Sequence, residues 1–346
     1  MAHTTIRVMP GIVEVDDLVK EFRTFDRREG LIGAITDLFH RRYRTLRAVN
    51  RITFEIRPGE MVGYIGPNGA GKSTTIKMLT GILVPTSGAV FANGYIPWKH
   101  RTAYTKTIGV VFGQRTQLWW DIAVVESFRL LKRIYDVSDA DYRARMKQFD
   151  EILELGRYLH TPVRKLSLGE RMRCDVAAAM LHNPPLVFLD EPTIGLDLVA
   201  KENIRTFLHE VNRRYGTTML LTTHDLSDIE ELCRRLMIID HGSLLFDGGL
   251  QELKDRLWQE SALRVELKDP SQVARLESLH IPDVVCDRVD KLTYRLHFPR
   301  ESWSTAEVVR QVVNAVEVRD IAIEEQSIEE VVRRIYLGEE LKEWSR

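Results

Sequence analysis

The sequence predicts an α/β protein, with a layered α/β domain over about residues 1–250 and a small α+β domain over residues 255–346. Up to about residue 248, apolar strand-like runs alternate with helical stretches. Several of these runs are continuous and rich in β-branched residues, as in strands covered on both faces. After residue 255 the order becomes strand-helix-strand-strand-helix-strand, which is the order of a ferredoxin-like unit.

The elements of the first domain can be assigned in chain order. The strand candidates are GIVEV, ITFEI, MVGYIG, AVFANG, IGVVFG, PLVFLD, TTMLLTT and RLMIID. Residues of about 115–175 show helical patterns, so we expect a helical subdomain there. In the segment of about residues 26–46, apolar residues fall on one helix face and the far end carries arginines, which predicts an amphipathic helix.

The second domain has four strand candidates, RVELK, VVCDR, LTYRLHF and VRDIAIEE. The helix candidates SQVARLESL and TAEVVRQVVNA lie between them, and a last helix is expected over SIEEVVRRIYLGEELKEW. No catalytic or metal-binding cluster is evident in this domain. A structural or dimer-supporting role is expected, and a regulatory ligand site is the alternative.

Composition limits the possible partners. The 346 residues carry a formal net charge of −1, so no overall attraction to nucleic acid exists and we expect no nucleic-acid partner. The three cysteines lie far apart, which favours reduced thiols over a metal site. No apolar run reaches the ~18 residues that span a bilayer. We expect the chain to remain inside the cell and to act on a membrane only through a partner.

GYIGPNGAGKSTT is the strongest local motif. Gly66, Gly71, Lys72 and Ser73 match G-x-x-x-x-G-K-[ST], between a strand and a helix as this phosphate-binding loop requires. Backbone N–H groups and the helix dipole would surround phosphates, Lys72 would reach the β- and γ-phosphates, and Ser73 would ligate Mg²⁺. Nucleotide contacts are expected at Gly66, Asn68, Gly69, Ala70, Gly71, Lys72, Ser73 and Thr74. The motif alone leaves kinases, GTPases and motors open.

PLVFLDEPT supplies the second half of a nucleotide site. This apolar strand ends in Asp190 and Glu191, whose side chains point different ways. Asp190 can hold the Mg²⁺ shell, and Glu191 can accept a proton from an attacking water. Twenty residues before Asp190, LSLGERMRCD places Ser167 as a helix N-cap and Glu170 as its capping-box partner.

With LSLGE in this place, the chain resembles the ATP-binding cassette (ABC) ATPases, whose signature is usually written LSGGQ. The resemblance covers about residues 10–250. It implies a P-loop cassette with a RecA-like core, an antiparallel β-subdomain and the helical subdomain. Ser167 and Gly169 are retained, whereas Leu168 and Glu170 depart from the consensus, and the charge of Glu170 near a polyphosphate would affect ATP-driven closure.

The remaining landmarks of the resemblance follow in order. Gln114 matches the glutamine that joins Mg²⁺ and water to the helical subdomain. Asp197 in GLD matches the loop that crosses the dimer interface, and His224 matches the switch histidine at the γ-phosphate. Phe22 matches the aromatic residue that stacks on adenine, with Tyr43 and Phe25 as competitors. The implied catalytic set is Glu191, His224 and Gln114, and the implied metal set is Ser73, Gln114 and Asp190.

The resemblance also implies cofactors and partners. ATP and Mg²⁺ would be sandwiched in a head-to-tail dimer, with the signature residues Ser167, Gly169 and Glu170 facing the nucleotide of the second ATPase subunit, most simply an identical copy. Multi-span permease subunits would hold the chain peripherally at the cytoplasmic face of the membrane. The stretches GPNGAGKSTTIKMLTGILVPTSG, GQRTQLWWD, LSLGERMRC and LDEPTIGLDLVAK look like those of drug exporters of the daunorubicin and viologen type. The alternative is a non-transport cassette that acts as a nucleotide switch.

Two features point toward the membrane partner. Trp119 and Trp120 follow Gln114, where such ATPases receive a helix of the permease; we expect at least one to touch it, the alternative being that both pack inside the helical subdomain. The predicted helix of about residues 26–46 either caps the adenine edge or reaches the membrane face. In the second case Arg41, Arg42, Arg44 and Arg47 would meet lipid phosphates or acidic loops.

Overall fold

A computed structural model of the chain describes residues 13–25, 43–113, 115–257 and 260–324, together with Val332 and Ile335. The chain divides into two compact units, Met1–Gly248 and Gly249–Arg346. In the described part of the chain, no helix combines the length and the apolar character that crossing a bilayer requires.

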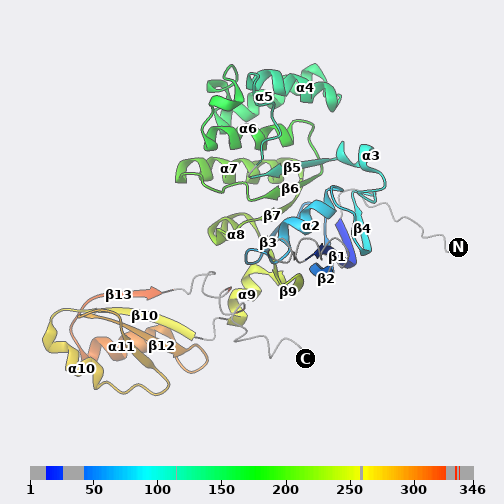
Figure 1. Cartoon of the computed structure of the whole chain (residues 1–346). Helices are drawn as coiled ribbons and strands as arrows, with labels where there is room; N and C mark the ends of the chain where they lie inside the picture. Colours follow the sequence, from blue (N-terminus) through cyan, green and yellow to red (C-terminus); the bar gives the residue numbers. More distant parts are fainter. Residues whose placement is uncertain are drawn as a thin grey trace, which may run out of the picture. The chain divides into compact units, whose positions relative to one another are not determined.

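The centre of the first unit is a six-stranded sheet with the order β5-β6-β7-β3-β8-β9 (Figure 1). Its strands are β3 (Met61–Ile65), β5 (Ile108–Phe112), β6 (Leu186–Asp190), β7 (Thr218–Thr222), β8 (Arg235–Asp240) and β9 (Ser243–Gly249). Neighbours from β5 to β8 are parallel, and β3, β6 and β7 are almost entirely buried, as their continuous apolar runs predict. Because parallel strands end at the same edge, the segments after β3, β6 and β7 meet there.

A three-stranded antiparallel sheet with the order β2-β1-β4 packs against the parallel sheet. Its strands are β1 (Val13–Phe25), β2 (Tyr43–Ile56) and β4 (Ser87–Ala92). Side chains of this sheet, including Val15, Ile52 and Val90, share a buried cluster with Tyr64 and Phe188 of the parallel sheet. The predicted α/β class is therefore confirmed, with a layered core built from both sheets.

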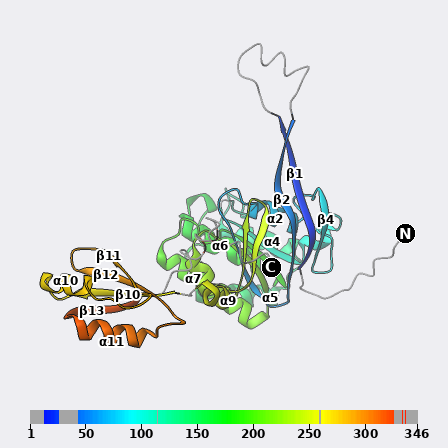
Figure 2. The same ribbon diagram turned by 90° about the horizontal axis from the view of Figure 1, so that it is seen from below.

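The structure corrects one end of the predicted amphipathic helix. Residues 43–46 belong to β2, which pairs with β1 as far as Phe25 opposite Tyr43 (Figure 2). The helical spacing of apolar residues does not continue here, because backbone pairing with β1 imposes the two-residue period of a strand. Arg47 bonds Glu21 across the ribbon at 2.8 Å and also Asn50, so its guanidinium is engaged within the sheet. The remainder of the predicted helix, residues 26–42, lies outside the described residues.

Helices surround the parallel sheet. They are α2 (Lys72–Leu79), α3 (Arg101–Thr105), α4 (Val124–Ile134), α5 (Asp139–Leu153), α6 (Leu168–Met180), α7 (Leu198–Tyr215) and α8 (Leu226–Leu232), with short 3₁₀ turns η1 (Leu155–Arg157) and η2 (Val163–Lys165). Figure 1 shows α4, α5 and α6 grouped beyond α7, where the helical subdomain was predicted. The last helix of that group runs past the predicted limit to Met180.

The second unit contains a four-stranded antiparallel sheet with the order β11-β12-β10-β13. Its elements are α9 (Leu250–Leu257), β10 (Glu260–Leu267), η3 (Pro270–Gln272), α10 (Val273–Glu277), β11 (Val285–Arg288), β12 (Thr293–Pro299), α11 (Thr305–Ala315) and β13 (Val318–Glu324). One face of β10 and β12 packs with α11 in a separate core that includes Leu263, Leu296 and Val312. The final predicted helix lies outside the described residues, except Val332 and Ile335, which are helical and buried.

Candidate functional site

The loop between β3 and α2 has a backbone that only glycine allows at two positions. Gly71 has φ +108°, and a Cβ there would lie 2.4 Å from the Ala48 carbonyl oxygen. A Cβ at Gly66 would lie 2.4 Å from the Ile239 carbonyl oxygen. Among the described residues no side chain caps α2, so the N–H groups of its first turn remain available to an anion.

Lys72 lies at the start of α2 and is only 7% exposed. Its ammonium donates to the carbonyl oxygens of Gly66 at 2.5 Å and Pro67 at 3.2 Å, so the side chain folds back along the loop. Burial lowers the pKa of Lys72, while the carboxylates of Glu191 and Asp190 act in the opposite direction. A partly desolvated ammonium in this position favours an anionic ligand.

Asp190 ends β6 and faces the start of α2. Its Oδ1 accepts a hydrogen bond from the Thr222 hydroxyl at 2.6 Å, and the Ser73 hydroxyl lies 3.4 Å from the same oxygen. Mg²⁺ prefers carboxylate and hydroxyl oxygens and usually completes its shell with phosphate and water. The Ser73 and Asp190 oxygens therefore fit a Mg²⁺ ion that shares its coordination with a bound phosphate.

Glu191 follows in a strained backbone conformation. Its φ is +58°, which costs roughly 1–2 kcal/mol for a residue with a Cβ. The surroundings impose this turn: the Glu191 N–H donates to Thr222 O at 3.0 Å, and Gly113 donates to Asp190 O at 2.7 Å. A Cβ at Gly113 would lie 2.1 Å from the Glu191 carbonyl oxygen. Strain of this kind is typical of functional positions.

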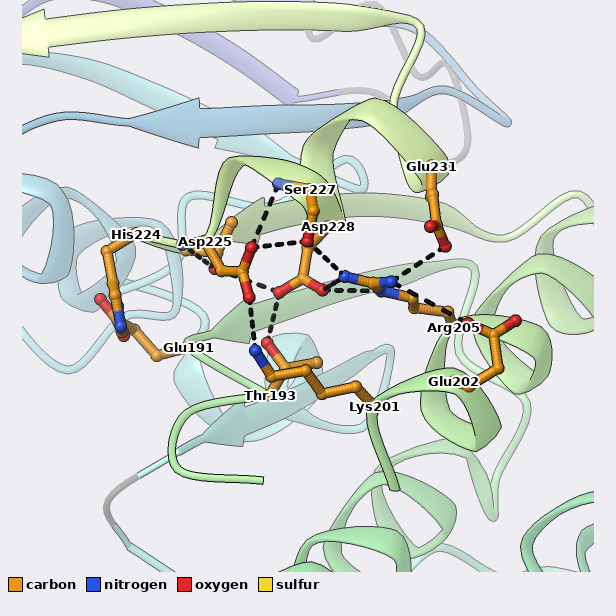
Figure 3. Close-up of polar contacts among 11 residues, drawn as sticks. Glu191, Thr193, Lys201, Glu202, Arg205, His224, Asp225, Ser227, Asp228 and Glu231 are labelled. Carbon is orange, nitrogen blue, oxygen red and sulfur yellow. Dashed lines mark hydrogen bonds and ion pairs between the residues drawn. The ribbon is translucent and has the colours of Figure 1, made fainter. Parts of the chain in front are cut away.

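The Glu191 carboxylate contacts His224, which follows β7. The Glu191 Oε2 lies 2.6 Å from His224 Nδ1 (Figure 3). The His224 side chain is 59% exposed, whereas that of Glu191 is 20% exposed. The imidazole thus orients the carboxylate from its solvent side, and its second ring nitrogen has no hydrogen-bond partner among the described residues, so it can make another contact.

Lys72, Ser73, Asp190 and Glu191 border one cavity of about 620 Å³, whereas Gly66, Thr222 and His224 are not among its described lining residues. Its described lining residues are Phe22, Leu46, Ala48, Pro67, Asn68, Gly69, Ala70, Gly71, Lys72, Ser73, Thr74, Lys77, Ile82, Phe112, Gly113, Arg115, Asp190 and Glu191. Phe22 lies opposite Leu46 in the β1–β2 ribbon, and both line the cavity with Ile82, which gives it an apolar end. The cavity therefore joins an apolar surface to a phosphate cradle and a pair of carboxylates.

The predicted signature residues lie elsewhere. Ser167 is the N-cap of α6, and its hydroxyl accepts the Glu170 N–H at 3.3 Å. The Glu170 carboxylate accepts the Ser167 N–H at 2.8 Å, so the predicted capping box is present. Gly169 faces α7, where a Cβ would lie 3.3 Å from the Ala200 Cβ. Asp197 caps α7 by accepting the Ala200 N–H at 2.8 Å. These four residues are absent from the cavity lining described above.

Gln114 lies outside the described residues, but the loop that follows it is tied to α6. Asp175 accepts hydrogen bonds from the Thr116 hydroxyl at 2.8 Å and the Gln117 N–H at 3.0 Å. Burial raises the pKa of Asp175 to about 6, against the lowering effect of these bonds. The loop then exposes Trp119 by 41% and Trp120 by 49%, with the Arg171 guanidinium 5.6 Å from the Trp120 ring.

Sequence reasoning missed several residues of this site. Leu46 and Ile82 enter the cavity through the folding of the ribbon and the segment after α2, and no local motif marks them. Thr222 ends β7, which pairs with β6, so strand order could have revealed its contact with Asp190. Asp175 directly precedes the apolar run VAAAM of α6, and that placement was the available signal.

Comparison with known proteins agrees with this geometry. The ABC transporter family profile matches residues 49–194. The Nod factor export ATP-binding protein I of Cupriavidus metallidurans is 38% identical over 208 residues, covering 60% of this chain and 68% of that protein. The ABC transporter ATP-binding protein NatA of Bacillus subtilis is 29% identical over 215 residues, covering 62% and 87%. The cholesterol transporter ABCA5 of Rattus norvegicus is 33% identical over 67% of this chain, which spans only 14% of that longer protein.

Solved structures show the same fold. An ATP-binding subunit of an ABC transporter matches with a TM-score of 0.59 and 27% identity, covering 71% of this chain and 92% of that one. A dimeric ATP-binding cassette in a post-hydrolysis state, bound to ADP and Pi, matches with a TM-score of 0.57 and 25% identity, covering 69% and 98%.

Proposed function

The chain belongs to the family of ABC transporter ATP-binding proteins, and we propose that it is the ATPase subunit of an exporter whose permease is a separate chain. The chain is an ATPase of the P-loop class. A relative that it covers by two thirds is named an export ATP-binding protein, which supports the export direction. Within exporters, the resemblance of the stretches GQRTQLWWD and LDEPTIGLDLVAK to those of drug exporters favours the drug-exporter type.

Three groups of residues line the same cavity: the phosphate cradle, the apolar end and the pair of carboxylates. Their proximity supports the proposal that the chain hydrolyses ATP. Lys72 and the free N–H groups of α2 bind the β- and γ-phosphates, and the Phe22 end of the cavity takes the adenine. Glu191, oriented by His224, accepts the proton of the attacking water. A Mg²⁺ ion held by Ser73 and Asp190, and by Gln114 as the resemblance implies, would neutralise charge on the phosphates.

A second copy completes the site in this proposal. Ser167, Gly169, Glu170 and Asp197 lie outside the cavity of their own chain, so their predicted phosphate contacts require another subunit. The Ser167 hydroxyl accepts a bond from Glu170 but keeps its own proton for a phosphate. ATP bound between two subunits stabilises the dimer, and hydrolysis removes that stabilisation. The similar cassette bound to ADP and Pi is a dimer, which supports this arrangement.

The permease contact is proposed at the loop that carries Trp119 and Trp120. Both side chains are more than two-fifths exposed, and large aromatic residues are favoured interface anchors. The bonds from Thr116 and Gln117 to Asp175 fix the start of this loop on α6, which pre-organises it for binding. Binding there would hold the chain at the cytoplasmic face of the membrane.

Transport in inside-out vesicles tests the proposal. The chain is coexpressed with the membrane subunits that copurify with it, and uptake of daunorubicin or methyl viologen is measured with and without ATP. We expect ATP-dependent uptake, and we expect the Trp119→Ala/Trp120→Ala variant to lose it while keeping its basal ATPase activity. ATPase activity without uptake of either compound would contradict drug export and favour a nucleotide switch.

A further inference from the structure

A buried polar cluster lies behind Glu191 and His224, between α7 and α8 (Figure 3). We propose that Asp228 and Arg205 are positioning residues for hydrolysis, which hold Glu191 and His224 in their mutual geometry and tie both to the helix that begins at Asp197. This inference rests on the proposed roles of Glu191 and His224.

Asp228 is the centre of the cluster. It is 0% exposed, and its Oδ1 accepts from Arg205 Nε at 2.7 Å and lies 2.6 Å from a second guanidinium nitrogen. Its Oδ2 accepts from the hydroxyls of Thr193 and, at 3.2 Å, of Thr223. One carboxylate therefore receives four contacts from three separate segments.

The two threonines explain why this carboxylate matters for the active site. Thr193 lies two residues after Glu191, and Thr223 lies directly before His224. The segments that carry Glu191 and His224 are thus bonded to the same buried oxygen atom. Because Glu191 has a strained backbone, it needs support of this kind to remain in place.

Arg205 connects this point to α7. It is 6% exposed, and besides Asp228 its guanidinium bonds the Ser227 hydroxyl at 2.7 Å and the Glu231 carboxylate at 3.1 Å. One helical turn earlier, the Lys201 ammonium bonds Asp225, the N-cap of α8. Two cations on one face of α7 therefore fix the first turns of α8, whose N-cap Asp225 directly follows His224.

These bonds link the proposed dimer contact at Asp197 to the catalytic residues Glu191 and His224. α7 begins at its cap Asp197, which we propose to contact the second subunit. A displacement of α7 would move Arg205, and Arg205 would move Asp228 and the two threonines with it. A buried ion pair contributes little net stability compared with apolar packing, so stability alone is a weak explanation for this cluster.

Arg205→Lys is the first test variant, because lysine keeps the charge and loses the planar fork that reaches Asp228, Ser227 and Glu231. We expect kcat for ATP hydrolysis to fall by roughly tenfold or more, with KM for ATP changed less than about twofold. Arg213→Lys is the matched control: it lies on the same helix, its side chain is 75% exposed, and its partner Glu210 is a surface residue. It should leave kcat unchanged.

A double-mutant cycle separates positioning from general destabilisation. In a His224→Ala background, Arg205→Lys should cost much less additional kcat, because the group that it helps to position is gone. An equal loss in both backgrounds would overturn the inference, as would a loss confined to thermal stability. If His224→Ala alone kept full kcat, the proposed role of His224 would fail first, and the inference with it.

A smaller change guards against a misfolded Arg205 variant. Thr193→Val removes only the hydroxyl that bonds Asp228 and keeps the side-chain shape, whereas Thr193→Ser keeps the hydroxyl. We expect Thr193→Val to lower kcat severalfold at unchanged KM and Thr193→Ser to retain it. Equal kcat in the two threonine variants would overturn the inference independently of Arg205.

Discussion

At the scale of single residues, Glu191 has a strained backbone that its neighbours hold in place. Its left-handed backbone is held by strand β7 and by the close approach of Gly113, and its carboxylate meets His224. Sequence alone predicted the carboxylate, because DE follows an apolar strand. It did not predict the strain, which arises from three segments that meet only in the folded chain.

The residues that bind phosphate and those proposed to position the catalytic pair divide in the same way. Lys72, Ser73 and the glycines follow from one local motif, whose spacing fixes the geometry. Asp228 and Arg205 have no such motif, because their contact depends on how α7 and α8 pack. The role of Gln114 stays a prediction.

Glu170 gives a test at this scale. Glu170→Gln keeps a capping-box acceptor for the Ser167 N–H and removes a negative charge that would face the partner's nucleotide. We expect the ATP concentration for half-maximal activity to fall by roughly 2–5-fold, and less so at high salt. ATPase titrations at two ionic strengths measure this.

The chain supplies its own control for Glu170. Ser304 and Glu307 form a second capping box at the start of α11, in the other unit. Glu307→Gln makes the same chemical change there and should leave the ATP dependence unaltered. Equal shifts in both variants would show that charge near the nucleotide is not the cause.

At the scale of elements, the β1–β2 ribbon shows where local patterns mislead. Leu46 and Arg47 continue a plausible helical face in the sequence, yet in the structure Leu46 opposes Phe22 and Arg47 opposes Glu21. A pattern within one segment cannot report that a distant strand offers pairing. The central strands were predicted well because burial on both faces requires a continuous apolar run, which is visible locally.

The pairing of Phe25 with Tyr43 suggests how to test the segment between them. Replacing residues 26–42 by an Asn-Gly turn would close the hairpin directly. We expect the melting temperature and basal ATPase activity to be retained and vesicle transport to fall, if the segment meets the membrane partner. Loss of basal ATPase activity would instead indicate that the segment supports the adenine end of the cavity.

The link between Asp175 and the loop after Gln114 predicts a pH dependence of stability. Burial raises the pKa of Asp175 to about 6, whereas the ordinary value is 3.8. As the pH falls through about 6, the folded chain takes up a proton that the unfolded chain does not, so folding gains stability on acidification. Above that pH the buried charge costs stability.

Urea unfolding at pH 7.5, 6.5 and 5.5 measures this effect. Relative to Asp175→Asn, the wild-type chain should gain on the order of 1 kcal/mol of unfolding free energy over this range. Asp121→Asn is the control, since that side chain is 77% exposed, and it should follow the wild type. Parallel pH profiles for wild type and Asp175→Asn would contradict the prediction.

At the scale of the whole molecule, the chain consists of an ATPase unit and a second unit that has its own hydrophobic core. The first unit holds every described residue of the candidate site, and the second has an antiparallel sheet whose strands and helices follow one another along the chain in the predicted order. Alternating patterns sufficed to predict that sheet. They could not predict its role, because its described residues carry no cluster of metal-binding side chains.

The ATP-bound state of Glu191→Gln tests the central claim most directly. Light scattering with ATP should detect a persistent dimer, and hydrolysis should slow by ~10² or more, because the amide cannot accept the proton of water. Adding Lys72→Ala should abolish the dimer, since phosphate binding is lost. Near-normal hydrolysis by Glu191→Gln, or no dimer with ATP, would contradict the account.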